Sequence, residues 1–147
     1  MKKYRIGYTQ GTYDLFHIGH LNLLTNAKKM CDYLIVGVNS DKLVKEYKNK
    51  ETKSNQLDRA KIVSNLRMVD EVIITNTLDK ELIYKHIKFD AIFIGDDWKN
   101  NDRWQKTEEQ LKKYNVPVVY LPHTDGISST MLRENFSDNI KVENIDG

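Results

Sequence analysis

The feature that most constrains the fold is a nearly continuous apolar run at residues 33–38, Tyr-Leu-Ile-Val-Gly-Val. A run without polar alternation is typical of a strand that is buried on both faces of a parallel sheet. Four further short, β-prone segments are predicted as strands, at residues 5–9, 71–75, 90–94 and 116–121. Because parallel strands need crossover connections, helices are expected between them.

Amphipathic or capped segments fill these intervals. Helices are predicted over residues 21–31, 41–47, 56–69, 80–88, 103–114 and 128–136. Ser40 or Asp41 would cap the second helix, and Asp79 the fourth. The alternation predicts a Rossmann-like, doubly wound α/β fold with a five-stranded parallel sheet and right-handed crossovers. We expect one catalytic domain over residues 1–136 and a polar tail over residues 137–147.

Composition excludes several other classes of protein. The chain has 147 residues, of which 39% are hydrophobic and 30% charged, as in ordinary globular domains. The net charge of +2, with dispersed lysines, gives no argument for a nucleic-acid or membrane partner. Cys31 is the single cysteine, so no intrachain disulfide can form. No signal-type or membrane-spanning apolar stretch is present, and a cytoplasmic location is expected.

Polar clusters follow the predicted strands. They occupy residues 11–20, 40–41 with the lysine-rich loop 48–55, 95–98 and 123–130. In open parallel sheets, ligands bind at the carboxyl ends of the strands, near the point where the strand order switches. One pocket is therefore expected to collect all four clusters.

The first cluster favours an anionic ligand. His17 and His20 flank Gly19 where a strand–turn–helix unit should begin its helix. Backbone N–H groups at a helix start carry partial positive charge and bind phosphate well. The two histidines are also compatible with a plain role as helix-start residues that make local hydrogen bonds.

Several common chemistries lack their motifs. The chain has neither a P-loop nor a Gly-x-Gly-x-x-Gly after the first strand, and no Gly-x-Ser-x-Gly elbow. His17 and His20 have no cysteine or carboxylate at a typical metal-ligand spacing, and Asp14 alone is weak support. Phosphoryl or nucleotidyl transfer fits better, since it needs anionic substrates held in line and donors aimed at the transferred phosphorus.

The motif His17-Ile18-Gly19-His20, preceded by Gly11-Thr12-Tyr13-Asp14, resembles the His-x-Gly-His nucleotidyltransferase superfamily. Three further blocks resemble those of the cytidylyltransferases: Arg67-Met68-Val69-Asp70-Glu71-Val72, Gly95-Asp96-Asp97-Trp98 and Thr124-Asp125-Gly126-Ile127-Ser128-Ser129-Thr130. The ordered set is similar to the bacterial glycerol-phosphate cytidylyltransferases over residues 4–134, nearly the whole chain.

This resemblance implies a reaction in which an alcohol phosphate attacks the α-phosphorus of CTP, giving a CDP-alcohol and pyrophosphate. The implied product is CDP-glycerol from glycerol 3-phosphate, for a cell-surface polymer such as teichoic acid or capsule. Glycerol 2-phosphate, another polyol phosphate, an adenylyltransferase using ATP and a nucleotide-binding module without turnover are the alternatives. Mg²⁺ is expected to accompany the CTP phosphates, and relatives of this kind form homodimers.

The resemblance also assigns roles to residues. The implied catalytic residues are His17, His20 and Lys48, with Lys45 or Lys50 as substitutes for the lysine. The implied nucleotide-binding residues are Thr12, Tyr13, Asp14, Gly19, Asp97, Trp98, His123, Thr124, Gly126, Ser128 and Ser129. The implied substrate-binding residues are Asp41, Arg59 and Arg67, and no protein metal ligand is predicted.

Simpler explanations exist for some of these residues. Lys48 is also compatible with a solvated loop lysine, and Trp98 with a core or lid aromatic. Arg59 has possible helix partners in Asp58 or Asp70. Two positions depart from the family pattern, since His123 stands where arginine is usual and Ser129 where threonine is commoner. Because of these departures, the resemblance indicates the type of reaction more firmly than the identity of the alcohol phosphate.

Overall fold

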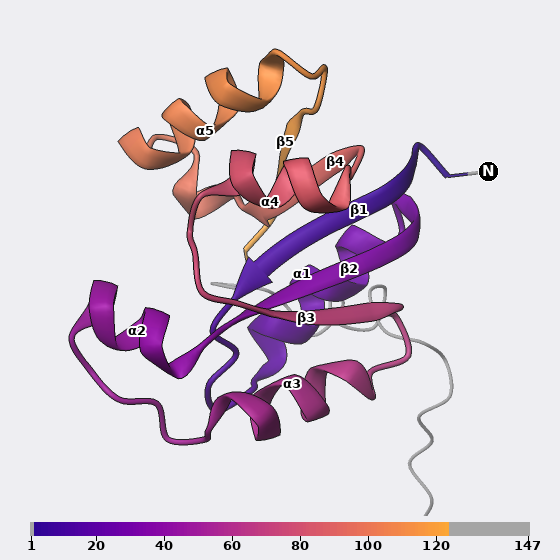
Figure 1. The fold of residues 1–147 in the computed structure, drawn as a ribbon. Helices are drawn as coiled ribbons and strands as arrows, with labels where there is room; N and C mark the ends of the chain where they lie inside the picture. The colour runs from indigo at the N-terminus through magenta and orange to yellow at the C-terminus, as the bar shows by residue number, and fades with distance from the viewer. Residues whose placement is uncertain (1, 124–147) are drawn as a thin grey trace, which may run out of the picture.

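The fold is known from a computed structural model that describes residues 2–123. Its centre is a five-stranded sheet in the order β3-β2-β1-β4-β5, with every paired strand parallel (Figure 1). The strands are β1 (Tyr4–Gly11), β2 (Cys31–Asn39), β3 (Glu71–Thr75), β4 (Ala91–Gly95) and β5 (Val118–Leu121). The predicted Rossmann-like, doubly wound fold is confirmed.

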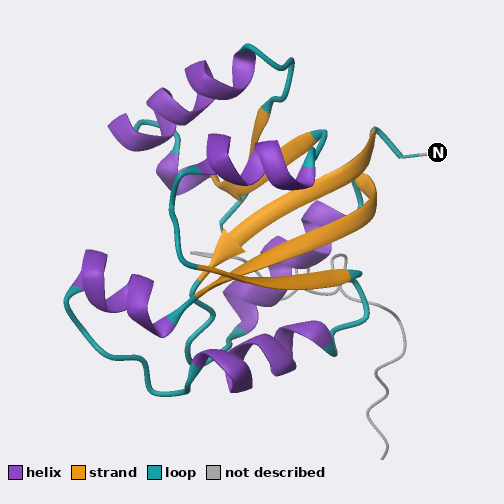
Figure 2. Cartoon of the chain, viewed as in Figure 1, coloured by secondary structure: helices purple, strands orange, loops and turns teal. Residues whose placement is uncertain are grey.

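Helices cover both faces of the sheet. They are α1 (Ile18–Lys28), α2 (Asp41–Lys48), α3 (Gln56–Ser64), α4 (Lys80–Ile87), α5 (Asp102–Lys112) and the short 3₁₀ helix η1 (Asp96–Trp98). Helices α1 and α3 lie on one face and α4 and α5 on the other, while α2 extends beyond the carboxyl end of β2 (Figure 2). None of the helices within residues 2–123 is long and apolar enough to cross a membrane.

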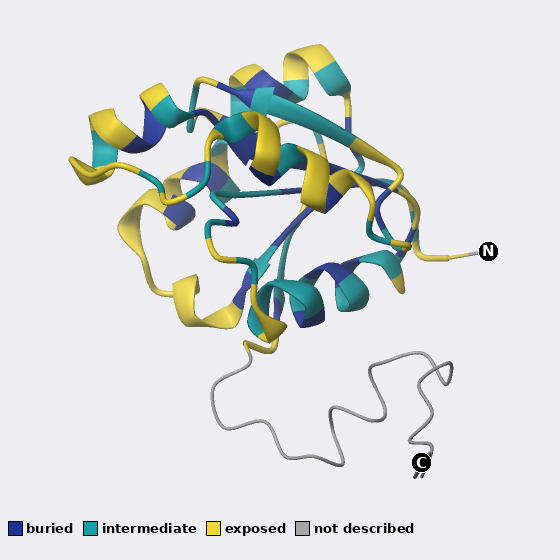
Figure 3. Cartoon of the chain, turned by 90° about the horizontal axis from the view of Figure 1, so that it is seen from below, coloured by how far each residue is buried: buried dark blue, intermediate teal, exposed yellow. Residues whose placement is uncertain are grey.

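The interior strand β2 shows how the sheet is buried on both sides. Leu34, Val36 and Val38 point into the cluster formed with α1 and α3. Ile35 points the other way, into the cluster formed with α4 and α5. Buried residues accordingly concentrate on the sheet and on the helix sides that face it (Figure 3). The continuous apolar run of the sequence reflects these two cores, because successive side chains in a strand alternate between faces.

Two predicted helix starts are confirmed in detail. The Ser40 hydroxyl accepts the Leu43 N–H at the start of α2. The Asp79 carboxylate accepts the N–H groups of Glu81 and Leu82 at the start of α4. Both contacts satisfy donors that a helix start otherwise leaves unpaired.

Several predicted boundaries were wrong, and three of them are instructive. Helix α3 ends at Ser64 instead of residue 69, because the Asn65 side chain bonds the Lys61 carbonyl and tight turns follow. Those turns keep an apolar spacing of three residues, which imitates a helix in the sequence. Helix α1 ends at Lys28, and the residue expected at its end, Cys31, begins β2. Strand β5 starts after Pro117 instead of at residue 116. The predicted helix at residues 128–136 lies outside the described residues.

Gly7 on β1 provides a test of this packing. A Cβ at Gly7 would lie 2.5 Å from the Phe93 ring and 2.7 Å from Cys31 Sγ. We expect Gly7→Ala to lower the free energy of unfolding by about 1–3 kcal/mol through overpacking. Urea denaturation monitored by circular dichroism measures the change, and an unaltered midpoint would contradict the tight approach.

Candidate active site at the carboxyl ends of the strands

A cavity of about 490 Å³ lies at the carboxyl ends of the strands, where the order switches between β1 and β4. Its walls come from the β1–α1 turn, the ends of β2 and β4, helix α2 and the start of α5. The predicted site residues that line it are Thr12, Tyr13, Asp14, His17, His20, Lys48 and Trp98. The fold therefore brings three of the four predicted polar clusters into one pocket.

The turn between β1 and α1 has an unusual backbone. Tyr13 and Leu15 both adopt left-handed conformations, with φ of 57° and 50°. Such conformations cost energy in residues other than glycine and persist only where surrounding contacts hold them. Gly11 makes this turn possible, because a Cβ there would lie 2.9 Å from the buried Tyr13 ring.

The two histidines cap helix α1 through their own side chains. His17 Nδ1 accepts the Gly19 N–H at 3.0 Å, and His20 Nδ1 accepts the His17 N–H at 3.2 Å. A neutral imidazole whose Nδ1 accepts carries its proton on Nε2. Each neutral ring therefore has an Nε2–H donor, at a helix start that already favours anions.

The two histidine rings stack on each other. Their centroids lie 3.8 Å apart, and His20 packs against the edge of the Tyr13 ring. Burial, followed by the neighbouring His17, lowers the pKa of His20 to about 4. His20 is therefore a neutral hydrogen-bond donor at pH 7. The interpretation of these residues as helix-start residues and the catalytic interpretation are compatible, because capping uses Nδ1 and leaves Nε2.

Asp14 ties the β1–α1 turn to the lysine-rich loop. Its carboxylate accepts the N–H of Lys53 at 2.8 Å and that of Ser54 at 3.1 Å. Partial burial opposes ionisation, but these two hydrogen bonds and the charge of Arg59 hold the pKa of Asp14 below its ordinary value. Asp14 therefore stays ionised and fixes the loop that follows Lys48 beside the histidines.

Arg59 lies beneath the pocket and is 1% exposed. Its guanidinium donates to the carbonyl oxygens of Ser54, Thr12 and Asn39 at 3.0, 2.7 and 2.8 Å. It also forms an ion pair with Asp41 at 2.6 Å. The suggested pairing with Asp58 or Asp70 was wrong; Asp70 instead bonds Lys28 and the Leu34 N–H.

The other two predicted substrate residues lie outside the 490 Å³ cavity. Asp41 accepts hydrogen bonds from Thr52 and Gln56 besides Arg59, and it borders a separate surface hollow. Arg67 is exposed in the segment that precedes β3. It therefore lies at the amino end of the parallel strands, opposite the end that carries the pocket. Gly19 lies in the first turn of α1, where its N–H is bonded to His17.

The structure adds lining residues that the sequence interpretation missed. They include Gln10, Asn39, Tyr47, Lys80 and Arg103. Gln10 and Asn39 sit at the ends of β1 and β2, and Lys80 is the first residue of α4. For Gln10 and Asn39 the position at the end of a strand was the available signal, whereas Tyr47, Lys80 and Arg103 lie in helices and no motif marks them.

Lys80 is the buried cation of the pocket. It is 5% exposed, its Nζ donates to the Leu78 carbonyl at 2.8 Å, and it lies 5.1 Å from the Trp104 ring centroid. Burial, and next the charge of Arg103, lowers the pKa of Lys80 to about 8. Its charge is thus poorly compensated within the described residues, which favours an anionic ligand beside it.

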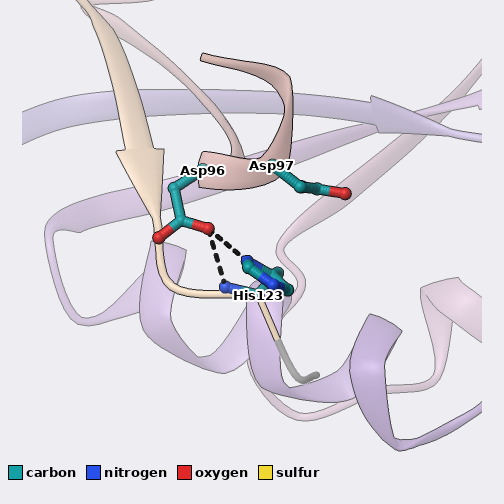
Figure 4. Close-up of side chains that lie close together, drawn as sticks. All are labelled: Asp96, Asp97 and His123. Atoms are coloured by element: carbon teal, nitrogen blue, oxygen red, sulfur yellow. Dashed lines mark hydrogen bonds and ion pairs between the residues drawn. The ribbon is translucent and has the colours of Figure 1, made fainter. Parts of the chain in front are cut away.

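Asp96, Asp97 and His123 gather at the ends of β4 and β5 (Figure 4). Asp96 Oδ1 accepts hydrogen bonds from the backbone N–H and Nδ1 of His123. One ligand atom from each of the three residues lies within 4.8 Å of the others, a set compatible with a divalent cation. The Asp96–His123 pairing accounts for the arrangement without an ion. His123 and Asp97 do not line the cavity, and Thr124, Gly126, Ser128 and Ser129 lie outside the described residues.

Comparison with known proteins places the chain in a family. Residues 8–135 match the family model described as cytidylyltransferase-like. The chain belongs to this family. The cytidylyltransferase-like chain is 39% identical over 131 residues to a glycerol-3-phosphate cytidylyltransferase of Bacillus spizizenii, covering 88% of this chain and 95% of the relative. It is 35% identical to an FAD synthase of Thermococcus sibiricus, covering 83% of this chain and 82% of the relative.

A solved structure supports the fold independently. The lipopolysaccharide core biosynthesis protein of Thermoplasma volcanium superposes with a TM-score of 0.68 at 22% identity. The match covers 82% of this chain and 97% of the other. At this identity the likeness concerns the fold alone.

Proposed function

We propose that this cytidylyltransferase-like chain joins CTP and glycerol 3-phosphate to give CDP-glycerol and pyrophosphate. The observation that carries the proposal is its likeness to glycerol-3-phosphate cytidylyltransferases along almost their whole length, at 39% identity in Bacillus spizizenii and 37% in Bacillus subtilis. The donor-rich pocket described above is consistent with two phosphorylated substrates.

In this reaction an oxygen of the alcohol phosphate bonds to the α-phosphorus of CTP. The bond from the α-phosphorus to the bridging oxygen breaks, and pyrophosphate leaves with its electron pair. The Nε2–H groups of His17 and His20 would donate to the phosphate oxygens as charge develops on them. Lys48 would neutralise the triphosphate from the end of α2. No covalent enzyme intermediate is required.

The remaining assignments are proposed from the resemblance. The nucleotide would contact Thr12, Tyr13, Asp14, Gly19, Asp97, Trp98, His123, Thr124, Gly126, Ser128 and Ser129. Because the Arg59 guanidinium is engaged with protein groups, we propose that Arg59 and Asp41 support the substrate site indirectly. The role of Arg67 stays a prediction.

Mg²⁺ would reach the pocket on the CTP phosphates. The residues that line the pocket fit a metal–nucleotide complex better than a free ion, because both carboxylate oxygens of Asp14 already accept backbone N–H groups. When bound, the ion would reduce the negative charge that the two substrates bring together. The histidines and lysines would still supply the directed hydrogen bonds.

The decisive assay is pyrophosphate release with a panel of substrates. We expect release from CTP with glycerol 3-phosphate, and weaker or no release with glycerol 2-phosphate or longer polyol phosphates. The likeness to FAD synthases favours one alternative, an adenylyltransferase, so ATP with FMN belongs in the panel. Release from ATP and FMN, but from no CTP pair, would replace the proposed function with that alternative.

Lys80 gives this proposal a pH dependence. If its ammonium binds the phosphate of glycerol 3-phosphate, the KM for that substrate should rise as pH increases through about 8, where Lys80 loses its proton. The phosphate itself, with a second pKa of ~6, is already fully ionised there. Lys80→Met should raise KM at pH 7 about 10- to 100-fold and flatten the profile.

The matched control is Lys85→Met, an exposed lysine on the same helix, which should keep the wild-type profile. Initial rates at varied glycerol 3-phosphate and saturating CTP, between pH 6.5 and 9.5, provide the measurement. A KM that stays constant across pH 8 in the wild-type chain would argue against contact between Lys80 and the phosphate.

The proposed reaction also suggests a cellular role for the chain. CDP-glycerol would feed synthesis of a cell-surface polymer, and we propose a cytoplasmic homodimer without nucleic-acid or membrane partners. The division into a catalytic domain at residues 1–136 and a tail at residues 137–147 stays a prediction, because both boundaries lie outside the described residues.

A further inference from the structure

The pocket wall between β1 and α2 contains a chain of side-chain hydrogen bonds that the steps above do not use. It begins at Tyr8, which is fully buried and donates its O–H to Gln10 Oε1 at 2.7 Å. Gly37 makes room for this contact, because a Cβ there would overlap the Tyr8 hydroxyl. Burial raises the pKa of Tyr8, so the hydroxyl keeps its proton and remains a donor.

A backbone carbonyl sets the direction of this chain of bonds. Gln10 Nε2 lies 3.0 Å from the carbonyl oxygen of Thr77, a group that can only accept. The side-chain nitrogen of Gln10 must therefore face Thr77, and its oxygen must face Tyr8. The orientation of the amide thus follows from its partners and is not an arbitrary choice between N and O.

The same logic orients Asn39, which is 3% exposed. The second N–H of Gln10 goes to Asn39 Oδ1 at 2.8 Å. The Asn39 nitrogen must then face the other way. It donates to the hydroxyl oxygens of Thr12 and Tyr47, each at 3.2 Å. Thr12 and Tyr47 both line the pocket.

The hydroxyl groups of Thr12 and Tyr47 each have one O–H donor and two lone pairs. The Thr12 and Tyr47 hydroxyls bond each other at 3.2 Å, which uses one of their two O–H groups. Whichever hydroxyl accepts that bond also accepts an Asn39 N–H, so both its lone pairs are occupied. That hydroxyl keeps its own O–H, for which residues 2–123 supply no acceptor. The pair therefore offers the pocket one hydroxyl that can donate but cannot accept.

We infer that the Thr12–Tyr47 hydroxyl pair is a donor contact for a phosphate oxygen of a substrate, with Gln10 and Asn39 as positioning residues. The remaining O–H matches a phosphate oxygen, which can only accept, while the other hydroxyl of the pair keeps one lone pair. The Lys48 ammonium, 5.4 Å from the Tyr47 ring centroid, supplies positive charge beside the pair. This inference rests on the proposed function, and the phosphate belongs either to CTP or to glycerol 3-phosphate.

Two double variants test the contact. Thr12→Val with Tyr47→Phe removes both hydroxyls, whereas Thr12→Ser with Tyr47→Phe keeps one hydroxyl that can accept from Asn39 and donate to the ligand. Both variants lose the tyrosine hydroxyl, so they differ chiefly in one donor. Tyr33→Phe is the control for a distant tyrosine, since the Tyr33 hydroxyl bonds Glu71 outside the pocket.

We expect the variant without hydroxyls to show a KM about 10- to 100-fold above that of the serine-containing variant, for one of the two substrates. An effect on CTP identifies the nucleotide as the source of the phosphate, and an effect on glycerol 3-phosphate identifies the alcohol phosphate. Equal KM values for both substrates in the two variants, both folded by circular dichroism, would overturn the inference.

A second readout separates this inference from the proposed function. Calorimetry measures the Kd of each variant for CTP alone and for glycerol 3-phosphate alone, without turnover. Absence of pyrophosphate release by the wild-type chain would contradict the proposed function, yet the predicted difference in Kd between the variants would still support the contact. If the valine-containing variant fails to fold, Thr12→Ala with Tyr47→Phe, which also removes both hydroxyls, is compared with Tyr47→Phe alone, and equal Kd values for both ligands overturn the inference.

Discussion

His17→Asn is expected to reduce kcat by about 100- to 1,000-fold while the fold remains intact. Asparagine is a favourable N-cap residue, and its side-chain oxygen can replace Nδ1 as the acceptor of the Gly19 N–H. It has no donor at the position of the imidazole Nε2–H. Loss of one donor that stabilises developing charge costs about two to three orders of magnitude in turnover.

The comparison with His17→Ala separates capping from catalysis. Alanine removes both functions, so we expect the same loss of kcat together with about 1 kcal/mol less stability. His86→Asn is the matched control, because His86 is exposed on α4 and its ring bonds the Leu82 carbonyl, away from the pocket lining. Pyrophosphate release and thermal unfolding provide the two measurements. Wild-type turnover in His17→Asn would refute the donor role.

Arg59→Met is expected to lower the free energy of unfolding by about 3 kcal/mol and to abolish most activity. The substitution leaves the carbonyl oxygens of Thr12 and Asn39 buried without their donor. It also leaves Asp41 without its ion-pair partner, although Asp41 is partly exposed and water offsets some of that cost. Because Arg59 connects the strained β1–α1 turn to the end of β2 and to the lysine-rich loop, activity should fall with stability.

Arg5→Met is the control for this prediction, since Arg5 is exposed on β1. Such surface substitutions usually change stability by less than about 0.5 kcal/mol. Urea denaturation gives the free energies, and pyrophosphate release gives the activity. A loss of less than about 1 kcal/mol in Arg59→Met would show that the buried guanidinium does not hold the turn in place.

The fold was predictable because its signals are local and periodic. The apolar run of β2 and the capping residues Ser40 and Asp79 act over a few neighbouring residues. The errors arose where a local pattern has two explanations, as after Ser64, where tight turns share the three-residue spacing of a helix. Tertiary packing chooses between such explanations, and a short pattern does not contain that information.

The residues of the candidate site also divide into those that local sequence signals predict and those that they do not. His17, His20 and Lys48 were found because they lie in or near motifs, and the pocket contains all three. Gln10, Asn39, Tyr47 and Lys80 were missed because their meaning depends on partners far along the chain. Asn39, for example, is oriented by Gln10 and in turn orients Thr12 and Tyr47.

The amino-acid sequence alone was sufficient to predict the doubly wound sheet, the helix start at the His-x-Gly-His turn and the end of the sheet where the pocket lies. These properties depend on side-chain alternation, helix capping and strand direction, which neighbouring residues specify. Only the tertiary structure decided that Arg59 lies beneath the pocket, that Lys80 is buried within it and which way the Asn39 amide points. These properties depend on burial and on hydrogen bonds between distant segments, and such contacts exist only once the chain has folded.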